Sequence, residues 1–366
     1  MIRIAILSAR ATAHGPLPKL VSLLADALRR RGCEVETLPW GRRTEGESSF
    51  AKAVRRPRDV VEARRAVKRG RFPIVVVNTA HDWSTLVRDI VLVRALARSD
   101  RVIVLHFHGS QSPRLVAPGS GLFKRATAAL IRSVDGLFVL SVEEQSQWLS
   151  FSPSSQVLVV RNPRPALPQA RALEGDRRPM ILFVSRLMAG KGVFDLVRAF
   201  ALVNQQTSCR LVLAGDGPDA TRVQTLVADL NVASSIELRG HVNDEELARL
   251  YSAADIFALP TSLGEGFPTV ILEAMASGLP IVTTKSRGPA DHLADGEHAL
   301  FVPPNDPDAL AASLFRLLRD PDLCRRMAAA NRVKVREFDP DAVAAEYLAA
   351  LERIVVARTG EQLRAT

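Results

Sequence analysis

The sequence has few cysteines, few aromatic residues and no long apolar run, and each shortage excludes a class of protein. Its three cysteines, Cys33, Cys209 and Cys324, are far apart and form no CxxC pair, which argues against a disulfide framework and a cysteine zinc site. Aromatic residues make up 5% of the chain and no RNA- or DNA-binding module is recognisable, so no nucleic-acid partner is expected. No apolar run is long enough to cross a membrane as a helix.

The N-terminal stretch MIRIAILSARATAHG has only a very short apolar run, which is typical of a first β-strand and not of a secretory signal. Together with the unpaired cysteines, it predicts a cytoplasmic protein. The length of 366 residues and the 47% hydrophobic fraction favour two globular domains.

Acidic residues are scarce in the first half of the chain. Residues 1–170 hold 27 Lys and Arg against 13 Asp and Glu, a net charge of +14, whereas residues 171–366 hold 22 against 26, a net charge of −4. The basic residues are densest in residues 41–72. They form either a solvated surface without a partner or a surface for an anionic partner, such as the inner face of the plasma membrane, to which the protein would bind peripherally.

Short β-branched runs alternate with amphipathic stretches along the whole chain, which predicts doubly wound parallel sheets. The expected strands are 2–7, 34–38, 73–78, 101–107, 136–140, 156–160, 180–185, 210–215, 235–240, 255–260, 280–284 and 298–303.

A stretch with four prolines, NPRPALPQARALEGDRRP, interrupts this alternation and predicts an interdomain linker. We therefore expect an N-terminal Rossmann-like domain over residues 1–165, a linker over 166–179 and a second Rossmann-like domain over 180–338. A C-terminal helix, within 339–366, is expected to pack back toward the first domain. Ligands of such a pair bind in the cleft at the carboxyl ends of the strands.

The segment EGFPTVILEAMASGLP, residues 265–280, places two acids around the start of a helix. Pro268 suits the first helical position, and the backbone N–H groups of Thr269 and Val270 follow it as anion donors. Glu273 lies among apolar neighbours about 7 Å further along the helix axis. With Glu265 in the preceding loop, the segment fits the diphosphate, ribose and sugar of a nucleotide sugar.

Two other strand ends carry weaker signals for phosphate binding. In VSRLMAGKG, Arg186 and Lys191 follow a strand in a glycine-containing loop and can converge on a diphosphate. AGDGP, residues 214–218, either lets the backbone approach a ligand or is an ordinary tight connection.

Histidines follow two strands of the first half. In LHFHGS we expect His106 and His108 to point to opposite faces of the strand, and His108, followed by glycine, is the candidate for function. His81, in NTAHD, is expected to be structural. No histidine pair is expected to bind a metal.

The motifs SRLMAGKG, LVLAGDGP, IELRGHV, LYSAADIFALPTSLGEGFPTVILEAMASGLPIVTT and ADGEHALFVPPNDPDALA together resemble the retaining, nucleotide-sugar-dependent glycosyltransferases of the GT-B fold, glycosyltransferase family 4. Two glutamates separated by seven residues are the signature of that family. The resemblance covers about residues 180–320, and the first domain matches only in layout.

The resemblance implies catalytic roles for four residues. Arg186 and Lys191 would bind the donor diphosphate and stabilise the departing nucleotide diphosphate. Glu265 would lie beside the donor sugar, and His108 would contact that sugar from the first domain.

The resemblance also implies donor-binding positions. Glu273 would bind the ribose, and Gly215, Arg239 and Gly240 would lie near the base. The backbone of Gly266, Phe267 and Thr269 would lie near the sugar hydroxyls, beside the N–H group of Val270.

Three positions depart from the family pattern. The N-terminal loop SARATAHGPLPK has Gly15 where paired glycines are usual. SRGPAD, residues 286–291, keeps one of two usual glycines, and Pro268 stands where many members have glycine, which removes one N–H donor.

The function implied is that of a retaining hexosyltransferase needing no metal or cofactor, whose acceptor is a glycan or a lipid-linked molecule of cell-surface polysaccharide or glycolipid synthesis. The departing phosphate would deprotonate the acceptor in a front-face reaction. Two alternatives remain: an enzyme similar to a nucleotide-sugar 2-epimerase, and a non-catalytic subunit that binds nucleotide sugars.

Overall fold

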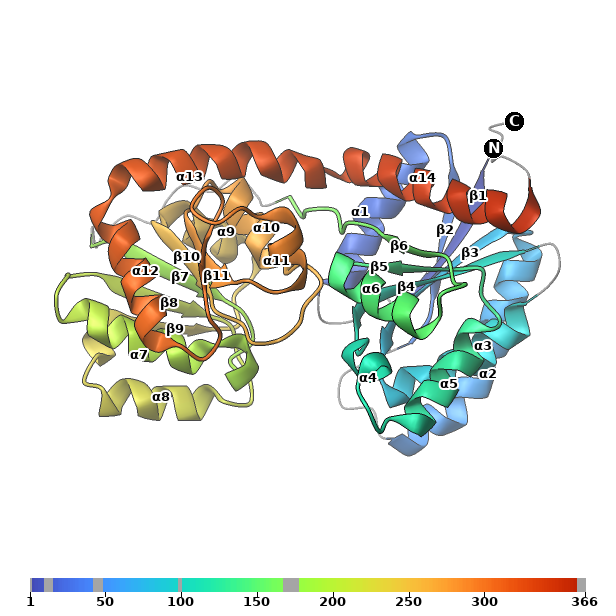
Figure 1. Cartoon of the computed structure of the whole chain (residues 1–366), viewed down its shortest axis with the longest axis horizontal. Helices are drawn as coiled ribbons and strands as arrows, with labels where there is room; N and C mark the ends of the chain where they lie inside the picture. The colour runs from blue at the N-terminus through green and yellow to red at the C-terminus, as the bar shows by residue number, and fades with distance from the viewer. Residues whose placement is uncertain (1, 10–15, 42–48, 98–100, 167–177, 361–366) are drawn as a thin grey trace. The chain divides into compact units, whose positions relative to one another are not determined.

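The computed structural model describes residues 2–9, 16–41, 49–97, 101–166 and 178–360, without the side chains of residues 49–55. The chain divides into two compact units, the first comprising residues 1–163 and 338–366 and the second residues 164–337 (Figure 1). Most of the predicted linker, residues 167–177, lies outside the described residues, as does Gly15. Among the helices within these ranges, none combines the length and apolarity needed to cross a membrane.

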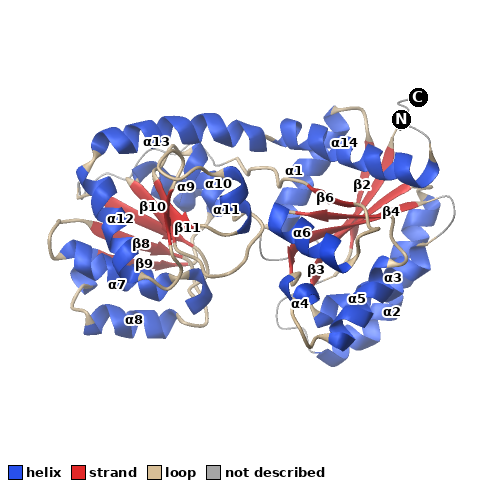
Figure 2. Cartoon of the chain, viewed as in Figure 1, coloured by secondary structure: helices blue, strands red, loops and turns tan. Residues whose placement is uncertain are grey.

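The first unit is built on a parallel sheet of six strands in the order β2–β1–β3–β4–β5–β6. The strands are β1 (Arg3–Ser8), β2 (Glu34–Pro39), β3 (Ile74–His81), β4 (Val102–Ser110), β5 (Gly136–Val139) and β6 (Val157–Val159). The strands other than β2 are mostly buried because helices cover both faces of the sheet, whereas β2 at its edge exposes Glu36 and Thr37 (Figure 2).

Two hydrophobic clusters, one on each face, hold these helices to the first sheet. Helices α1 (Leu17–Arg30) and α14 (Pro340–Thr359) pack on one face. The other face carries the helices α2 (Ser49–Arg69), α3 (Trp83–Leu96), α4 (Pro113–Val116), α5 (Gly121–Ile131) and α6 (Val142–Phe151). The last helix therefore belongs to the first unit, where Tyr347, Leu351 and Ile354 are buried against strand residues.

The second unit repeats the architecture with the strand order β12–β11–β10–β7–β8–β9, again all parallel. Its strands are β7 (Met180–Val184), β8 (Arg210–Ala214), β9 (Ile236–Gly240), β10 (Ile256–Leu259), β11 (Ile281–Thr284) and β12 (Leu300–Val302). Its helices are α7 (Val193–Asn204), α8 (Ala220–Asp229), α9 (Asp244–Ala253), α10 (Thr269–Ala276), α11 (Arg287–His292), α12 (Pro307–Arg319) and α13 (Pro321–Lys334).

The predicted doubly wound parallel sheets are confirmed, and each of the twelve expected strands overlaps an observed one. The largest differences are at β3 and β4, which continue three residues beyond the predicted ends, to His81 and Ser110. There Thr79 pairs with Phe107 and His81 with Ser110, so polar residues alone do not end a strand.

Candidate functional site

The predicted site residues of the second unit follow the carboxyl ends of its strands. Arg186 and Lys191 follow β7, Gly215 follows β8, and Arg239 and Gly240 end β9. The segment containing Glu265, Phe267 and Glu273 follows β10. Because all six strands are parallel, these ends share one edge of the sheet, where ligands of doubly wound folds bind.

The loops after β7 and β10 are in backbone contact, and a glycine permits it. Gly192 has φ +75°, and a Cβ atom there would lie 2.0 Å from the Pro260 carbonyl oxygen. In the same contact the Ser262 N–H donates to the Gly190 carbonyl at 2.9 Å. The two loops thus fix Lys191, which stands between Gly190 and Gly192.

Lys191 and Glu265 form an ion pair across these loops, with Lys191 Nζ donating to Glu265 Oε1. The two side chains are 14% and 30% exposed. The second carboxylate oxygen, Glu265 Oε2, is buried and accepts no hydrogen bond from the described residues. A buried acceptor without a donor is costly, so Glu265 Oε2 can accept a hydrogen bond from a ligand.

Arg186 is an exposed cation two residues beyond β7 and forms no ion pair within the described chain. Its backbone carbonyl accepts from Met188 N–H at 2.9 Å, which turns the loop toward Lys191. The loop therefore holds one cation neutralised by Glu265 and a second that is available to an anion.

Helix α10 begins at Thr269, one residue later than predicted. Pro268 occupies the N-cap position, because its ψ of 125° at φ −61° is extended and the helical conformation begins at the next residue. No side chain of the described residues caps this end. The N–H groups of Thr269 and Val270 precede the first bond of the helix, from Ile271 N–H to the Pro268 carbonyl, so they can donate to an anion.

Glu273 is 8% exposed, and Tyr251 of α9 explains how the helix holds a buried acid. The Tyr251 hydroxyl lies 3.0 Å from Glu273 Oε2 and 3.1 Å from the Val270 carbonyl oxygen. Burial and the neighbouring Glu273 carboxylate raise the pKa of Tyr251 well above its ordinary value, so the phenol keeps its proton and donates. Sequence analysis missed Tyr251, although it lies in the segment that carried the resemblance.

The end of β9 lies beside the loop after β8. Gly215 N–H donates to the Gly240 carbonyl at 2.7 Å, which joins the two positions expected near a nucleotide base. Arg239 is paired with two carboxylates, Glu237 at 2.7 Å and Glu246 at 3.7 Å.

Helix α11 packs tightly against the loop that precedes α10. A Cβ atom on Gly288 would lie 1.7 Å from the Gly266 carbonyl oxygen. Beside this contact the buried Phe267 ring meets the His292 ring edge-on at 5.5 Å. The single glycine kept in SRGPAD thus lets the backbone approach Gly266.

In the first unit, the prediction that His106 and His108 point to opposite faces of their strand is wrong. Their ring centroids are 4.1 Å apart, since residues two apart along a strand share a face. His108 Nε2 lies 2.6 Å from Asn78 Oδ1, and Asn78 Nδ2 donates to the Leu7 carbonyl at 3.2 Å. With its amide oriented in this way, Asn78 accepts from Nε2–H of His108 and leaves Nδ1 as an acceptor.

Burial keeps the three described histidines of this unit, His81, His106 and His108, uncharged at neutral pH. It lowers the pKa of His108 to about 3 and that of His106 well below its ordinary value. The His106 ring is also 3.3 Å, at Nδ1, from the Tyr347 hydroxyl of α14. His81 packs against the Phe107, Phe123 and Trp148 rings, and burial lowers its pKa to about 3.

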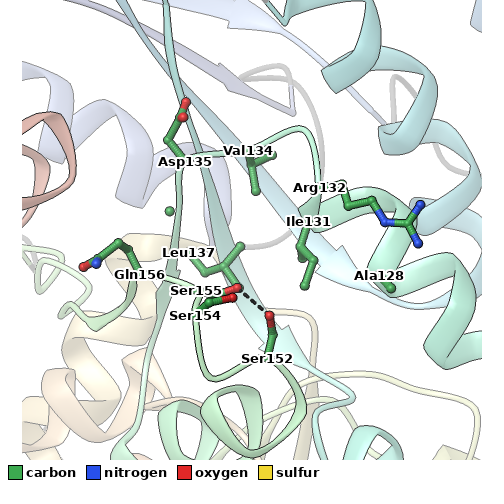
Figure 3. A pocket seen from close by; sticks show the side chains of 11 residues that line it. Ala128, Ile131, Arg132, Val134, Asp135, Leu137, Ser152, Ser154, Ser155 and Gln156 are labelled. Atoms are coloured by element: carbon green, nitrogen blue, oxygen red, sulfur yellow. Dashed lines mark hydrogen bonds between the residues drawn. The ribbon is translucent and has the colours of Figure 1, made fainter. Parts of the chain in front are cut away.

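Two cavities of the first unit hold none of the predicted site residues. One, of about 390 Å³, lies between the end of α5, the start of β5 and the loop after α6, where the Ser152 and Ser155 hydroxyls share a 2.8 Å hydrogen bond (Figure 3). The other, of about 330 Å³, lies between α1 and the ends of β1 and β2 and includes Ser8, whose buried hydroxyl has no partner among the described residues. Nor does the described chain gather three or more His, Cys, Asp or Glu side chains that could hold a metal ion.

Comparison with known proteins identifies relatives of this arrangement. The family model described as "Glycosyl transferases group 1" matches residues 169–334. Glycogen synthase of Mycobacterium tuberculosis is 30% identical over 288 residues, which is 74% of this chain and 68% of the relative. Other curated relatives are matched over only 23%, 37% and 46% of their own length.

Solved structures share the fold. Sucrose-phosphate synthase from Thermosynechococcus elongatus superposes with a TM-score of 0.78 at 22% identity, covering 98% of this chain and 100% of the other. HepE of Anabaena, solved in complex with UDP and glucose, superposes with a TM-score of 0.71 at 17% identity, covering 96% and 100%. The two six-stranded parallel sheets thus match GT-B glycosyltransferase structures, as predicted.

Proposed function

Because this chain belongs to the group 1 glycosyl transferases, we propose that it moves a hexose, with retention of anomeric configuration, from a nucleotide-diphosphate sugar to an acceptor. The observation that carries this proposal is the Lys191–Glu265 ion pair, whose second carboxylate oxygen is buried without a partner. In such a pair Lys191 supplies a cation for a phosphate group, and the second oxygen of Glu265 supplies an acceptor for a sugar hydroxyl. Both groups lie where the two loops meet.

Binding of the donor diphosphate would use the positive groups at the edge of the second sheet. Lys191 turns from Glu265 to the diphosphate, Arg186 adds a second cation, and the start of α10 adds backbone N–H groups. Glu273, held by Tyr251, accepts from the ribose hydroxyls. That HepE binds UDP and glucose on the same fold supports a nucleotide-sugar donor here.

Sugar transfer needs stabilisation of the charge that develops on the departing nucleotide diphosphate. Lys191 and Arg186 are fixed beside it by the loops and supply that stabilisation without a metal ion. The departing phosphate oxygen takes the proton of the acceptor hydroxyl on the same face, which gives retention. Glu265 holds the sugar through a hydroxyl and forms no covalent bond to it.

The acceptor is a glycan or lipid-linked molecule of cell-surface polysaccharide or glycolipid synthesis. This part of the proposal is supported by the +14 net charge of residues 1–170, which favours an anionic acceptor or surface.

The test is to incubate the protein with UDP-, GDP- and ADP-linked hexoses and candidate acceptors in the presence of EDTA. We expect release of one nucleotide diphosphate and, by NMR, a product with the anomeric configuration of the donor. An inverted product, or activity that returns only when Mg²⁺ is added, would contradict the proposed chemistry.

A further inference from the structure

In the first unit the helices α2, α3 and α5 carry five exposed apolar side chains. Trp83, Val87 and Val91 on α3 are 44%, 55% and 53% exposed, and their spacing of four residues places them on one side of the helix. Helix α3 packs against both α2 and α5 (Figure 1). Val61 on α2 and Leu122 on α5 are 46% and 72% exposed. We call these five residues the outer apolar row.

Exposed cations lie on the same three helices as the outer apolar row. They are Arg58, Arg65 and Arg69 on α2, Arg94 on α3 and Arg125 on α5. Within the described chain none of the five forms an ion pair. On the described side chains of these three helices, the only exposed carboxylate is Glu62.

The arrangement of the cations is unfavourable without an anionic partner. Arg65 and Arg69 stand four residues apart on α2, where like charges repel. Glu62, three residues before Arg65, offsets part of this repulsion, but the described side chains of α3 and α5 include no exposed carboxylate. Exposed apolar side chains beside unpaired cations mark an interaction surface.

We propose that the outer apolar row and its flanking arginines dock on an anionic lipid surface. Aliphatic side chains and an indole enter the boundary between headgroups and acyl chains, and guanidinium groups beside them bind the lipid phosphates. The proposal goes beyond sugar transfer and rests on the first unit alone. It shares α2 with the basic segment 41–72, predicted from charge, and adds α3 and α5, which lie outside that segment.

The row fits lipid better than nucleic acid. Single-stranded nucleic acids bind through aromatic platforms on which bases stack. The outer apolar row has one aromatic residue, Trp83, and four aliphatic ones. Moving aliphatic side chains from water into an acyl layer is favourable in free energy. A partner that is bound through its phosphates alone does not need such side chains.

The first arm of the test compares flotation with phosphatidylcholine vesicles and with vesicles that also contain phosphatidylglycerol. The double variant Val87→Asp/Val91→Asp changes two exposed positions, so circular dichroism and the unfolding temperature should match the wild type. Val333→Asp on α13, 65% exposed in the other unit, is the matched control. We expect binding of the wild type and the control to anionic vesicles only, and a loss of about tenfold or more in the double variant.

The second arm changes the charge of one arginine and leaves the apolar side chains in place. It tests the proposal even if the double variant Val87→Asp/Val91→Asp fails to fold. We expect Arg65→Glu to weaken binding at least about fivefold, while Arg326→Glu, an exposed arginine on α13, leaves it unchanged. The proposal is overturned by equal binding to both vesicle types, by no binding to either, or by binding that neither surface variant weakens. It is also overturned if an RNA oligonucleotide binds and the vesicles do not.

Discussion

The charge balance between Lys191 and Glu265 sets how the candidate donor site responds to its ligand. In the protein alone each neutralises the other, in contact between two loops. In the proposed site a diphosphate would compete with Glu265 for Lys191, whereas a complete nucleotide sugar would occupy both residues at once. We therefore expect the pair to favour the intact donor over the free nucleotide diphosphate that remains after transfer.

Replacing Glu265 with Gln separates the contribution of Lys191 to diphosphate binding from that of Glu265 to sugar binding. The variant loses the ion pair but keeps the size of the side chain, so Lys191 is released to phosphate. We expect affinity for the nucleotide sugar to fall about tenfold, while affinity for the free nucleotide diphosphate stays level or rises. Calorimetry measures the affinity for the nucleotide sugar and for the free nucleotide diphosphate. An equal loss of affinity for both ligands would show that Glu265 does not contact the sugar.

Tyr251 fixes the carboxylate expected to bind the ribose. Tyr251→Phe removes the hydroxyl that bonds Glu273, and we expect nucleotide affinity to fall about tenfold, the effect of one hydrogen bond to a charged group. The only other tyrosine, Tyr347, is a matched control, because Tyr347→Phe also removes one buried hydroxyl but in the first unit. A similar loss in both variants would attribute the effect to general destabilisation.

At the scale of elements, the position of α11 against the loop before α10 depends on one glycine. In Gly288→Ala the added Cβ atom would meet the Gly266 carbonyl oxygen at 1.7 Å, so the loop or the helix has to move. We expect transfer activity to fall by a factor of about a hundred, since a displacement of about an ångström at a reaction centre has that effect. Gly121→Ala, where the added Cβ atom meets nothing within 4 Å, should keep full activity. Wild-type activity in Gly288→Ala would show that this contact does not position the site.

Sequence reasoning recovered the elements because each strand is a local run of β-branched residues between helical stretches. It also placed Glu273 in an apolar environment from its immediate neighbours. The side-chain pairs could not be predicted from the sequence, because Lys191 and Glu265 are 74 residues apart along the chain and Asn78 and His108 are 30 apart. Partners on different strands are set by the order of strands in the sheet, which periodicity does not encode. The roles of all the candidate site residues toward a donor, those of His108 and Gly15 included, stay predictions.

At the scale of the whole molecule, the two units should respond differently to acid. His81 and His108 keep a pKa of about 3 in the folded first unit, and His106 is also strongly lowered, whereas an unfolded histidine titrates near its ordinary value of about 6.5. Between these values the unfolded chain binds more protons, so the contribution of these histidines to the stability of the first unit is fully present above about pH 6.5 and is lost as the pH falls toward 3. In the second unit burial lowers the pKa of His298, which acts in the same direction.

Differential scanning calorimetry between pH 7 and pH 4.5 measures this difference. We expect one unfolding transition to shift to lower temperature more than the other as the pH falls. His81→Phe, which keeps an aromatic ring among Phe107, Phe123 and Trp148, should reduce that shift and so assign the transition to the first unit. Equal shifts of both transitions, or no effect of the substitution, would contradict the assignment.

The most direct test of the account is the affinity of the wild type and of Lys191→Ala for UDP, GDP and ADP, measured by calorimetry. Lys68→Ala, which removes an exposed lysine of the first unit, is the charge-matched control. The account predicts that one nucleotide diphosphate binds, that Lys191→Ala weakens it about ten- to a hundredfold, and that the control does not change it. Unchanged affinity in Lys191→Ala would show that the Lys191–Glu265 pair is not the phosphate site.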